Sequence, residues 1–173
     1  MKIIFYIAST INGCIAAADG STPWSEEETQ SFLAKCREVR AVIMGRKTHD
    51  EYQLLGLEEW PLTAGPLVVL SSQSGLVSRY PETTFTKEGP AGTVRFLGSK
   101  GFNEAVVVGG NQTWTSFAKE GLVDEIFLDI EPLAFGDGKF LFSGGGVFDL
   151  KLKLLEHRPL GSQTIQLHYL VQK

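Results

Sequence analysis

The sequence predicts a single α/β domain with a mostly parallel, twisted sheet, flanking helices and an antiparallel C-terminal hairpin. Four short apolar runs have the length and β-branched content of buried strands, at 3–8, 41–44, 67–70 and 105–108. Segments with helical spacing follow the first and the last of these runs. Near the C-terminus two alternating segments flank a Pro-Leu-Gly-Ser turn and predict the hairpin, 150–157 with 164–171.

Length and composition agree with one globular domain. A chain of 173 residues with 43% hydrophobic and 21% charged residues lies in the ordinary globular range. The formal charge of -4 argues against a nucleic-acid-binding groove. The apolar run near Met1 is too short to span a membrane and is not followed by a signal-peptide cleavage pattern. Cys14 and Cys36 form no CxxC pair, so we expect a reducing compartment, the cytoplasm.

The first strand, 3–8, precedes a predicted helix over 25–39. Apolar residues recur there at helical spacing, at Phe32, Cys36 and Val39. Ser25 and Glu28 form the S-x-x-E signature of a capping box, which marks the helix start.

The fourth apolar run leads into a second strand-helix-strand unit. Gly109-Gly110 predicts a turn, a helical segment with Trp114 and Phe117 follows, and it ends at Gly121 before a strand over 126–130. Upstream, 87–92 is expected to be a surface loop, and 93–101 a helix that Gly98 weakens.

Polar and glycine-containing segments follow three of the strands, where ligands bind in open α/β sheets. A glycine, two cations and a hydroxyl follow the second strand in the run 44–48, and two hydroxyls follow the third at Ser71 and Ser72. Gly109-Gly110 then opens a helix, where backbone can approach a pyrophosphate. Each fragment alone also fits a tight turn or a solvated helix start. The chain lacks a G-x-G-x-x-G, a Walker A pattern and an H-E-x-x-H, so the predicted dinucleotide cradle is not a standard Rossmann site.

These fragments, in this order, resemble the dihydrofolate reductase superfamily over nearly the whole chain. The resemblance rests on Val42-Ile43-Met44-Gly45-Arg46-Lys47-Thr48, Val69-Leu70-Ser71-Ser72 and Val107-Val108-Gly109-Gly110, with Pro23-Trp24 and Phe135-Gly136-Asp137-Gly138. The segments 9–16 and 122–136 are more similar to the riboflavin-biosynthesis (RibD) C-terminal reductase domain. That group reduces the ribosyl unit of a phosphoribosylamino-pyrimidine with NADPH.

The resemblance implies a dihydrofolate-reductase-like fold and an NADPH site. By similarity the nicotinamide would contact Ala8 and Ile15. The adenosine half and its 2′-phosphate would contact Gly45, Arg46, Lys47, Thr48, Leu70, Ser71 and Ser72. The pyrophosphate would contact Val108, Gly109, Gly110, Asn111, Gln112 and Thr113. The cations Arg46 and Lys47 favour NADPH over NADH, because a 2′-phosphate needs cationic donors. Gln112 departs from the family, in which a basic residue often follows the glycine turn.

The substrate side has two candidate acids and three candidate contact residues. The superfamily carries a carboxylate early on the first helix; Glu28 fits it, although ungapped alignment from Pro23-Trp24 places Thr29 there. Partial burial would raise the pKa of Glu28 toward the range of a proton donor, but the side chain could equally cap the helix. Asp129 is the second candidate, either a buried acid or a solvent-facing residue of an edge strand. The resemblance puts Tyr6, Trp24 and Phe32 on the substrate side.

These features predict an NADPH-dependent reductase of the riboflavin-biosynthesis type acting on a small heterocycle. The alternatives are a dihydrofolate reductase, which the lack of a cation in 62–66 disfavours, and a non-catalytic dinucleotide- or pterin-binding module. His49, His157 and His168 have no metal-ligand spacing, so they are expected to be surface or hydrogen-bonding residues and no metal is predicted. We expect no nucleic-acid or membrane partner, and related reductase domains commonly form homodimers.

Overall fold

The computed structural model describes residues 1–54, 65–144, 146 and 148–173. Its main sheet has eight strands in the order β5-β4-β3-β6-β1-β7-β10-β9. The bounds in chain order are β1 Lys2–Thr10, β3 Val42–Gly45, β4 Leu67–Leu70, β5 Thr83–Thr86, β6 Glu104–Val107, β7 Glu125–Glu131, β9 Lys151–Leu160 and β10 Thr164–Gln172. A second sheet pairs β2 (Cys14–Ala17) with β8 (Gly138–Phe140).

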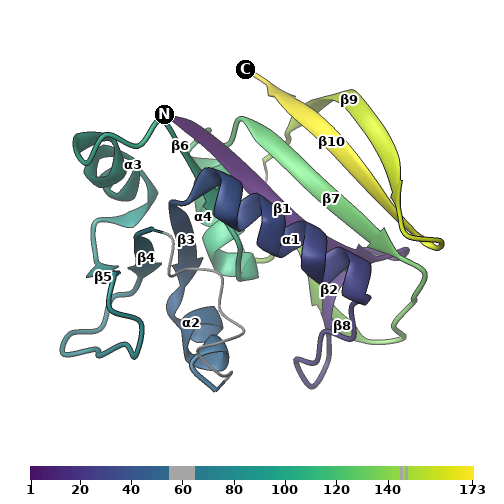
Figure 1. Cartoon of the computed structure of the whole chain (residues 1–173), viewed down its shortest axis with the longest axis horizontal. Helices are drawn as coiled ribbons and strands as arrows, with labels where there is room; N and C mark the ends of the chain where they lie inside the picture. The colour runs from purple at the N-terminus through teal and green to yellow at the C-terminus, as the bar shows by residue number, and fades with distance from the viewer. Residues whose placement is uncertain (55–64, 145, 147) are drawn as a thin grey trace.

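The strands from β5 to β7 run parallel, and the C-terminal hairpin adds the two antiparallel strands. In the register, Ala8 of β1 pairs with Asp129 of β7, and Gln166 of β10 pairs with Asp129 from the other side. Asp129 therefore lies in the interior of the sheet and not on an edge strand. Figure 1 shows the β9–β10 hairpin at the side of the sheet away from β5.

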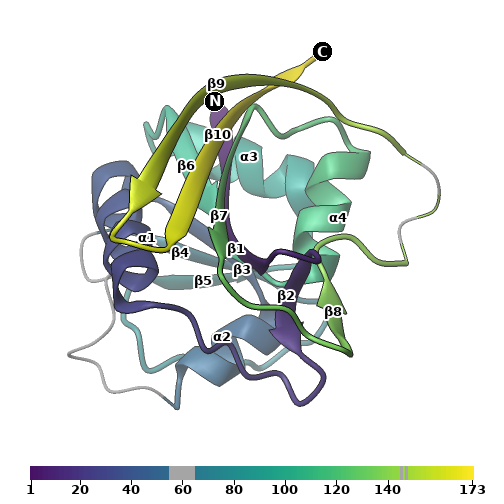
Figure 2. The same cartoon turned by 90° about the vertical axis from the view of Figure 1, so that its right-hand side faces the viewer.

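Helices cover both faces of the sheet, as the turned view shows (Figure 2). Helix α1 (Glu26–Val39) packs over one face, and α3 (Gly89–Ser99) and α4 (Asn111–Lys119) pack over the other. The alternation of β1 divides its side chains between two apolar cores, with Ile3, Phe5 and Ile7 toward α4 and Ile4 and Tyr6 toward α1. The short helix α2 (Arg46–Tyr52) follows β3 directly.

Local signals explain where α1 begins and ends. The Ser25 hydroxyl accepts a hydrogen bond from the Glu28 backbone N–H, and the exposed carboxylates of Glu26 and Glu27 in the first turn complement the helix dipole. At the other end the Arg40 backbone N–H bonds the Cys36 carbonyl, and Arg40 adopts a φ of 68°.

The fold confirms the predicted α/β architecture, including the mostly parallel sheet and the hairpin. One local prediction was wrong: the expected loop over 87–92 contains the start of α3 at Gly89, because Pro90 suits the first turn of a helix. His49, expected as a surface or hydrogen-bonding residue, is of the second kind, since it is buried with its Nε2 2.9 Å from the Ser78 hydroxyl. Within the described ranges no helix is long and apolar enough to span a membrane.

Candidate active site

Four adjacent parallel strands end at one edge of the sheet and carry the predicted cofactor residues there. In the order β4, β3, β6 and β1, their ends supply Leu70 to Ser72, Gly45 to Thr48, Val108 to Thr113, and Ala8. These segments are far apart in the sequence, and the sheet order makes them neighbours. The arrangement forms one continuous row of candidate contacts, as expected for the carboxyl edge of a parallel sheet.

The turns after β3 and β6 touch each other through backbone. The Gly45 N–H donates to the Gly109 carbonyl at 2.7 Å. A Cβ on Gly45 would lie 2.5 Å from the Thr113 hydroxyl oxygen, and one on Gly110 would lie 3.1 Å from the Thr48 hydroxyl oxygen. The peptide between Gly109 and Gly110 is cis, and Gly109 has a φ of 138°. Added Cβ atoms would crowd the space in which these turns meet, so glycine is favoured at Gly45 and at both positions of the second turn.

The second turn opens α4 and leaves backbone donors at the helix start. Gly110 is the N-cap of this nine-residue helix and provides no side-chain cap. Free N–H groups and the helix dipole at such an end suit an anion. The arrangement fits the pyrophosphate expected from the sequence, with Thr48 and Thr113 hydroxyls close by.

The two cations predicted to bind a 2′-phosphate differ in their surroundings. The Arg46 guanidinium forms an ion pair with Asp50 one helical turn later. Lys47 is exposed at the surface of α2. Asp50 thus partly neutralises Arg46, a competitor that the motif 45–48 alone did not indicate.

The segments that follow Ala8 and Ile15 contact the segment around Phe135, which follows β7. Ile15 lies half-buried in β2, which pairs with β8. The Trp24 ring stacks on Phe135 with centroids 6.2 Å apart, and the Asn12 amide donates to the Phe135 carbonyl at 2.7 Å. Two fragments of the resemblance, Pro23-Trp24 and Phe135-Gly136, therefore meet at one place.

Three carboxyl groups are buried between α1 and the sheet and are called the carboxyl cluster below: Glu28, Asp129 and Glu131. Their side chains lie on the face of the sheet that α1 covers, and their exposed fractions are 5%, 0% and 2%. Tyr6 and Phe32 border this cluster and contact each other edge to face, with ring centroids 5.6 Å apart.

Glu28 differs from the other two members of the carboxyl cluster in its hydrogen bonding. Within the described part of the chain its carboxyl group has no recorded hydrogen-bond partner, whereas its backbone N–H is bonded to the Ser25 hydroxyl. Burial, with the nearby charges of Asp129 and Glu131, raises the pKa of Glu28 to about 8. Thr29, the other register for the family carboxylate, is exposed and bonds the Ser25 carbonyl.

Asp129 is buried but fully hydrogen-bonded. Its Oδ2 accepts from the Tyr6 hydroxyl at 2.6 Å, and its Oδ1 accepts from the Gln166 amide at 2.8 Å. Burial raises its pKa to about 6, and the bonds from Tyr6 and Gln166 oppose that rise. The alternative of a solvent-facing aspartate is therefore wrong.

Glu131 makes the hydrogen bond to Ser25 that the sequence had suggested for Glu28 as an alternative to a role as proton donor. Its Oε2 accepts from the Ser25 backbone N–H at 3.2 Å, and its Oε1 accepts from the hydroxyls of Ser25 at 2.8 Å and Thr164 at 3.0 Å. Ser25 is the N-cap of α1, but the carboxylate that bonds its backbone N–H comes from a residue 106 positions away and not from Glu28. The strand predicted over 126–130 stopped one residue short of Glu131, although Asp129 and Glu131 share one face of a strand at a spacing of two.

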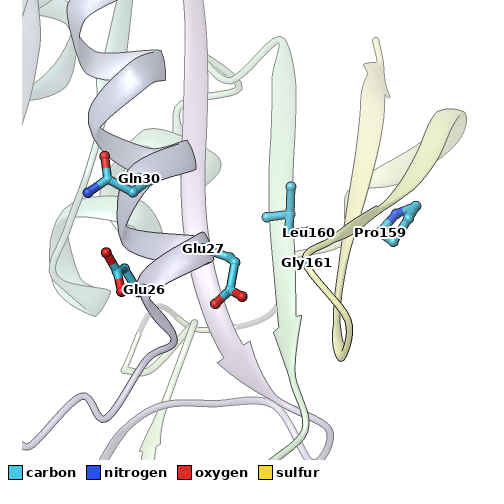
Figure 3. Close-up of a pocket in the computed structure, with 6 residues that line it drawn as sticks. All are labelled: Glu26, Glu27, Gln30, Pro159, Leu160 and Gly161. Carbon is cyan, nitrogen blue, oxygen red and sulfur yellow. The ribbon is translucent and has the colours of Figure 1, made fainter.

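Two grooves lie between α1 and the hairpin, away from the row of predicted cofactor residues. Figure 3 shows the first, of about 450 Å³, between Glu27 of α1 and the hairpin end at Leu160 and Gly161. The second, of about 380 Å³, is lined in part by Tyr6 and Gln166, the two donors to Asp129. The first groove contains no predicted site residue, so we place the candidate active site at the strand ends and the carboxyl cluster instead.

The chain is similar to known proteins over most or all of its length. A relative, the uncharacterized protein YwjB of Bacillus subtilis, is 31% identical over 97% of both chains. A dihydrofolate reductase of Neisseria gonorrhoeae is 30% identical over 78% of both chains. A putative riboflavin biosynthesis protein from Shewanella sp. PV-4 superposes with a TM-score of 0.85 at 26% identity, over the full length of both chains.

A larger bifunctional protein shares the fold. The diaminohydroxyphosphoribosylaminopyrimidine deaminase/5-amino-6-(5-phosphoribosylamino)uracil reductase from Thermotoga maritima superposes with a TM-score of 0.79 at 16% identity, over 99% of this chain and 56% of that one. The model of the RibD C-terminal domain matches residues 1–166 of this chain. With the sheet order and strand-end site described above, this match shows that the chain belongs to the RibD C-terminal domain family and has its dihydrofolate-reductase-like fold.

Proposed function

We propose that the protein is an NADPH-dependent reductase of the riboflavin-biosynthesis type that acts on a phosphoribosylamino-pyrimidine. The observation that carries the proposal is the contact between the turns at Gly45 and Gly109, beside the N-terminus of α4. A dinucleotide pyrophosphate needs close backbone and free N–H groups in that arrangement. The family supports the reaction type, and the Thermotoga relative is named for reduction of such a uracil.

In this proposal the row of strand ends binds the cofactor. Gly109, Gly110 and the first turn of α4 take the pyrophosphate, and Arg46 and Lys47 take the 2′-phosphate that distinguishes NADPH from NADH. Ala8 and Ile15 border the nicotinamide, which supplies hydride to an electrophilic carbon of the substrate.

The same reduction needs a proton on the nitrogen or oxygen next to the carbon that receives hydride. We assign that proton to Glu28, with Tyr6, Trp24 and Phe32 beside the substrate. Glu28 lies on the helix next to the strand that carries Ala8, and a pKa of about 8 keeps it protonated at neutral pH. Asp129 is the second candidate for this acid, but its two oxygens already accept hydrogen bonds.

The second candidate function is that of a dihydrofolate reductase, which the Neisseria relative favours. The segment 62–66, whose lack of a cation argued against folate, lies outside the described residues except for 65 and 66. A binding module without turnover is the third possibility.

The deciding experiment mixes the protein and NADPH with each candidate substrate and follows the loss of NADPH absorbance by stopped flow. We expect turnover with 5-amino-6-(5-phosphoribosylamino)uracil, little turnover with dihydrofolate, and tighter calorimetric binding of NADPH than of NADH. Rapid turnover of dihydrofolate with tight binding of a methotrexate-like antifolate would establish the second candidate. Cofactor binding with no oxidation by either substrate would favour the binding module, and equal affinity for the two cofactors would refute the 2′-phosphate site.

We also propose that the protein acts as a cytoplasmic homodimer. Both described cysteines are free and buried, as suits a reducing compartment. The edge strand β9 is exposed over nearly its whole length and presents Leu152, Leu154 and Leu155 to solvent. An open edge with exposed apolar side chains is suited to pairing with a second chain.

A further inference from the structure

Ionising all three buried carboxyl groups of the cluster would cost much free energy, so at least one of them is expected to hold a proton. The hydrogen-bond donors indicate which one, because a carboxyl group that accepts hydrogen bonds is stabilised as the anion. Glu131 receives three donors, from Ser25 and Thr164, and Asp129 receives two. Glu28 receives none within the described part of the chain.

The two donors to Asp129 act on different oxygens and are themselves oriented. The Tyr6 hydroxyl donates to Oδ2 at 2.6 Å and accepts from the Gln166 Nε2 at 3.1 Å, so its own hydrogen points to Asp129. Gln166 Nε2 donates to Oδ1 at 2.8 Å. Both oxygens of Asp129 are therefore acceptors.

Arg158 determines which end of the Gln166 amide faces the cluster. Its Nε donates to the Gln166 Oε1 at 2.9 Å. Since arginine offers donors only, the amide oxygen must face β9, and the amide nitrogen must face Asp129. A reversed Gln166 amide would place its oxygen against the Asp129 carboxylate, and the bonds to Arg158 and to Asp129 would both be lost.

The charged and titratable groups around the cluster agree with this orientation. Asp129 faces Tyr6 on β1, Glu28 on α1, Glu131 on its own strand and Arg158 on β9. Glu28 faces Asp129 and Glu131, and its charge also acts on Cys36 of α1 and Tyr52 of α2. Burial raises the pKa of Cys36 and of Tyr52, so neither adds a charge at neutral pH. Arg158 is thus the cation among these neighbours.

We propose that Tyr6, Gln166 and Arg158 are positioning residues that hold Asp129 as the anion of the carboxyl cluster and thereby leave the proton on Glu28. The two candidate acids, Glu28 and Asp129, then have different roles. Glu28 delivers the proton, and Asp129 is a fixed negative charge that keeps Glu28 protonated. The inference rests on the proposed function only in the statement that Glu28 serves the substrate.

The test is a ¹³C NMR titration of the carboxyl carbons of Glu28 and Asp129 in the protein without cofactor or substrate. In the wild type we expect Glu28 to lose its proton at a higher pH than Asp129. Tyr6→Phe and Gln166→Leu each remove a donor, so the Asp129 midpoint should rise by about one to two pH units. The Glu28 midpoint should fall, because a protonated Asp129 repels the Glu28 anion less. Arg158→Leu should give a smaller shift in the same directions.

Tyr80→Phe is the matched control, since it also removes a hydrogen bond donated by a tyrosine hydroxyl, but one to the Tyr52 carbonyl and not to a carboxyl group of the cluster. It should leave both midpoints unchanged. Unchanged midpoints in Tyr6→Phe and Gln166→Leu would overturn the proposal, as would a wild type in which Asp129 titrates above Glu28. The order of the Glu28 and Asp129 midpoints in the wild type tests the proposal even if a variant fails to fold. Absence of NADPH binding would refute the proposed function and leave this titration unaffected.

In an active enzyme the same variants give a second readout. The alkaline limb of the pH profile of turnover should move to lower pH in Tyr6→Phe, because Glu28 loses its proton earlier. A loss of turnover at every pH with no movement of the limb would mean that Tyr6 has only a structural role.

Discussion

At the scale of single residues, the site is defined by which carboxyl groups are buried and which are hydrogen-bonded. Asp129 and Glu131 are buried with donors, and Glu28 is buried without recorded donors in the described part of the chain. Burying a carboxyl group without donors favours its neutral form. This difference, more than position in the sequence, makes Glu28 a better candidate than Asp129 for the proposed proton donor.

Glu28→Gln should change how stability depends on pH. Burial raises the folded-state pKa of Glu28 from 4.5 to about 8, so between these values the unfolded chain loses a proton that the folded protein retains. The free energy of unfolding of the wild type should therefore fall as pH rises through this window, by up to about 1.4 kcal/mol per pH unit. Glutamine cannot titrate, so the free energy of unfolding of the variant, measured with urea, should rise relative to that of the wild type from pH 5 to 8. The exposed control Glu26→Gln should show no such trend, and a parallel course for Glu28→Gln would contradict the raised pKa.

Arg46→Ala should weaken NADPH binding by about 1.5 to 3 kcal/mol, the scale of a charged hydrogen bond, and barely change NADH binding. Calorimetric titration of both cofactors measures this. Asp50→Asn removes the anion paired with Arg46 and should tighten NADPH binding. Arg95→Ala, which removes an exposed arginine paired with Glu88, serves as the control. Equal losses for NADPH and NADH in Arg46→Ala would exclude a 2′-phosphate at this position.

Residue patterns predicted Glu28 and Asp129 as candidates but not their surroundings. The donors to Asp129 come from β1 and β10, 123 and 37 positions away, and only the sheet order makes them neighbours. Likewise, the S-x-x-E pattern identified Ser25 correctly as the start of α1, but the carboxylate that bonds Ser25 is that of Glu131 and not that of Glu28. Long-range pairing of this kind leaves no local signal in the sequence.

At the scale of elements, the site depends on how closely two strand ends approach. The turn after β3 and the turn after β6 meet because the Gly45 N–H bonds the Gly109 carbonyl and no Cβ lies between them. Motifs predicted these turns because glycine, cation and hydroxyl residues mark strand ends. Strand β5 was not predicted, since Thr83–Thr86 has no apolar periodicity and forms a strand by pairing with β4 at the sheet edge. Its sequence is polar because an edge strand is only partly buried.

Gly45→Ala should disrupt the contact between the two turns. The new Cβ would lie 2.5 Å from the Thr113 hydroxyl oxygen, so the Thr113 side chain or the first turn of α4 must shift. We expect a loss of about 1 to 3 kcal/mol in stability, the scale of overpacking, and at least a tenfold loss in NADPH affinity.

Two further variants check the cause of that loss. Thr113→Ala in the Gly45→Ala background removes the clashing oxygen and should restore most of the stability in thermal unfolding. Gly98→Ala, at a helical glycine with open space around it, should be neutral or stabilising. If Gly45→Ala keeps wild-type NADPH affinity, the turn has a structural role and is not part of the cofactor site.

At the scale of the whole molecule, the hairpin links the carboxyl cluster to the outer edge of the sheet. Gln166 and Thr164 of β10 bond Asp129 and Glu131, and Arg158 of β9 orients Gln166. A Cβ on Gly161 would lie 2.6 Å from the Glu27 carboxylate, so the hairpin end packs closely on α1. The sequence predicted the hairpin from its alternation, but it could not predict that nine of the ten residues of β9 are exposed, because exposure depends on what packs against the hairpin.

An exposed β9 leads to the prediction of a dimer at the scale of the assembly. Leu152, Leu154 and Leu155 are 42%, 48% and 46% exposed on an edge strand of ten residues, about 33 Å long. Antiparallel pairing of two such edges would satisfy backbone groups and bury these side chains.

Sedimentation velocity should give twice the 19.0 kDa chain mass at micromolar concentration. Leu154→Lys should shift the protein to monomers, because the charge would be buried at the interface. Val77→Lys, at an apolar residue that is 81% exposed elsewhere, should leave the dimer intact. A wild type that sediments as a monomer at every concentration tested would refute the dimer, and dissociation by both variants alike would place the interface elsewhere than on β9.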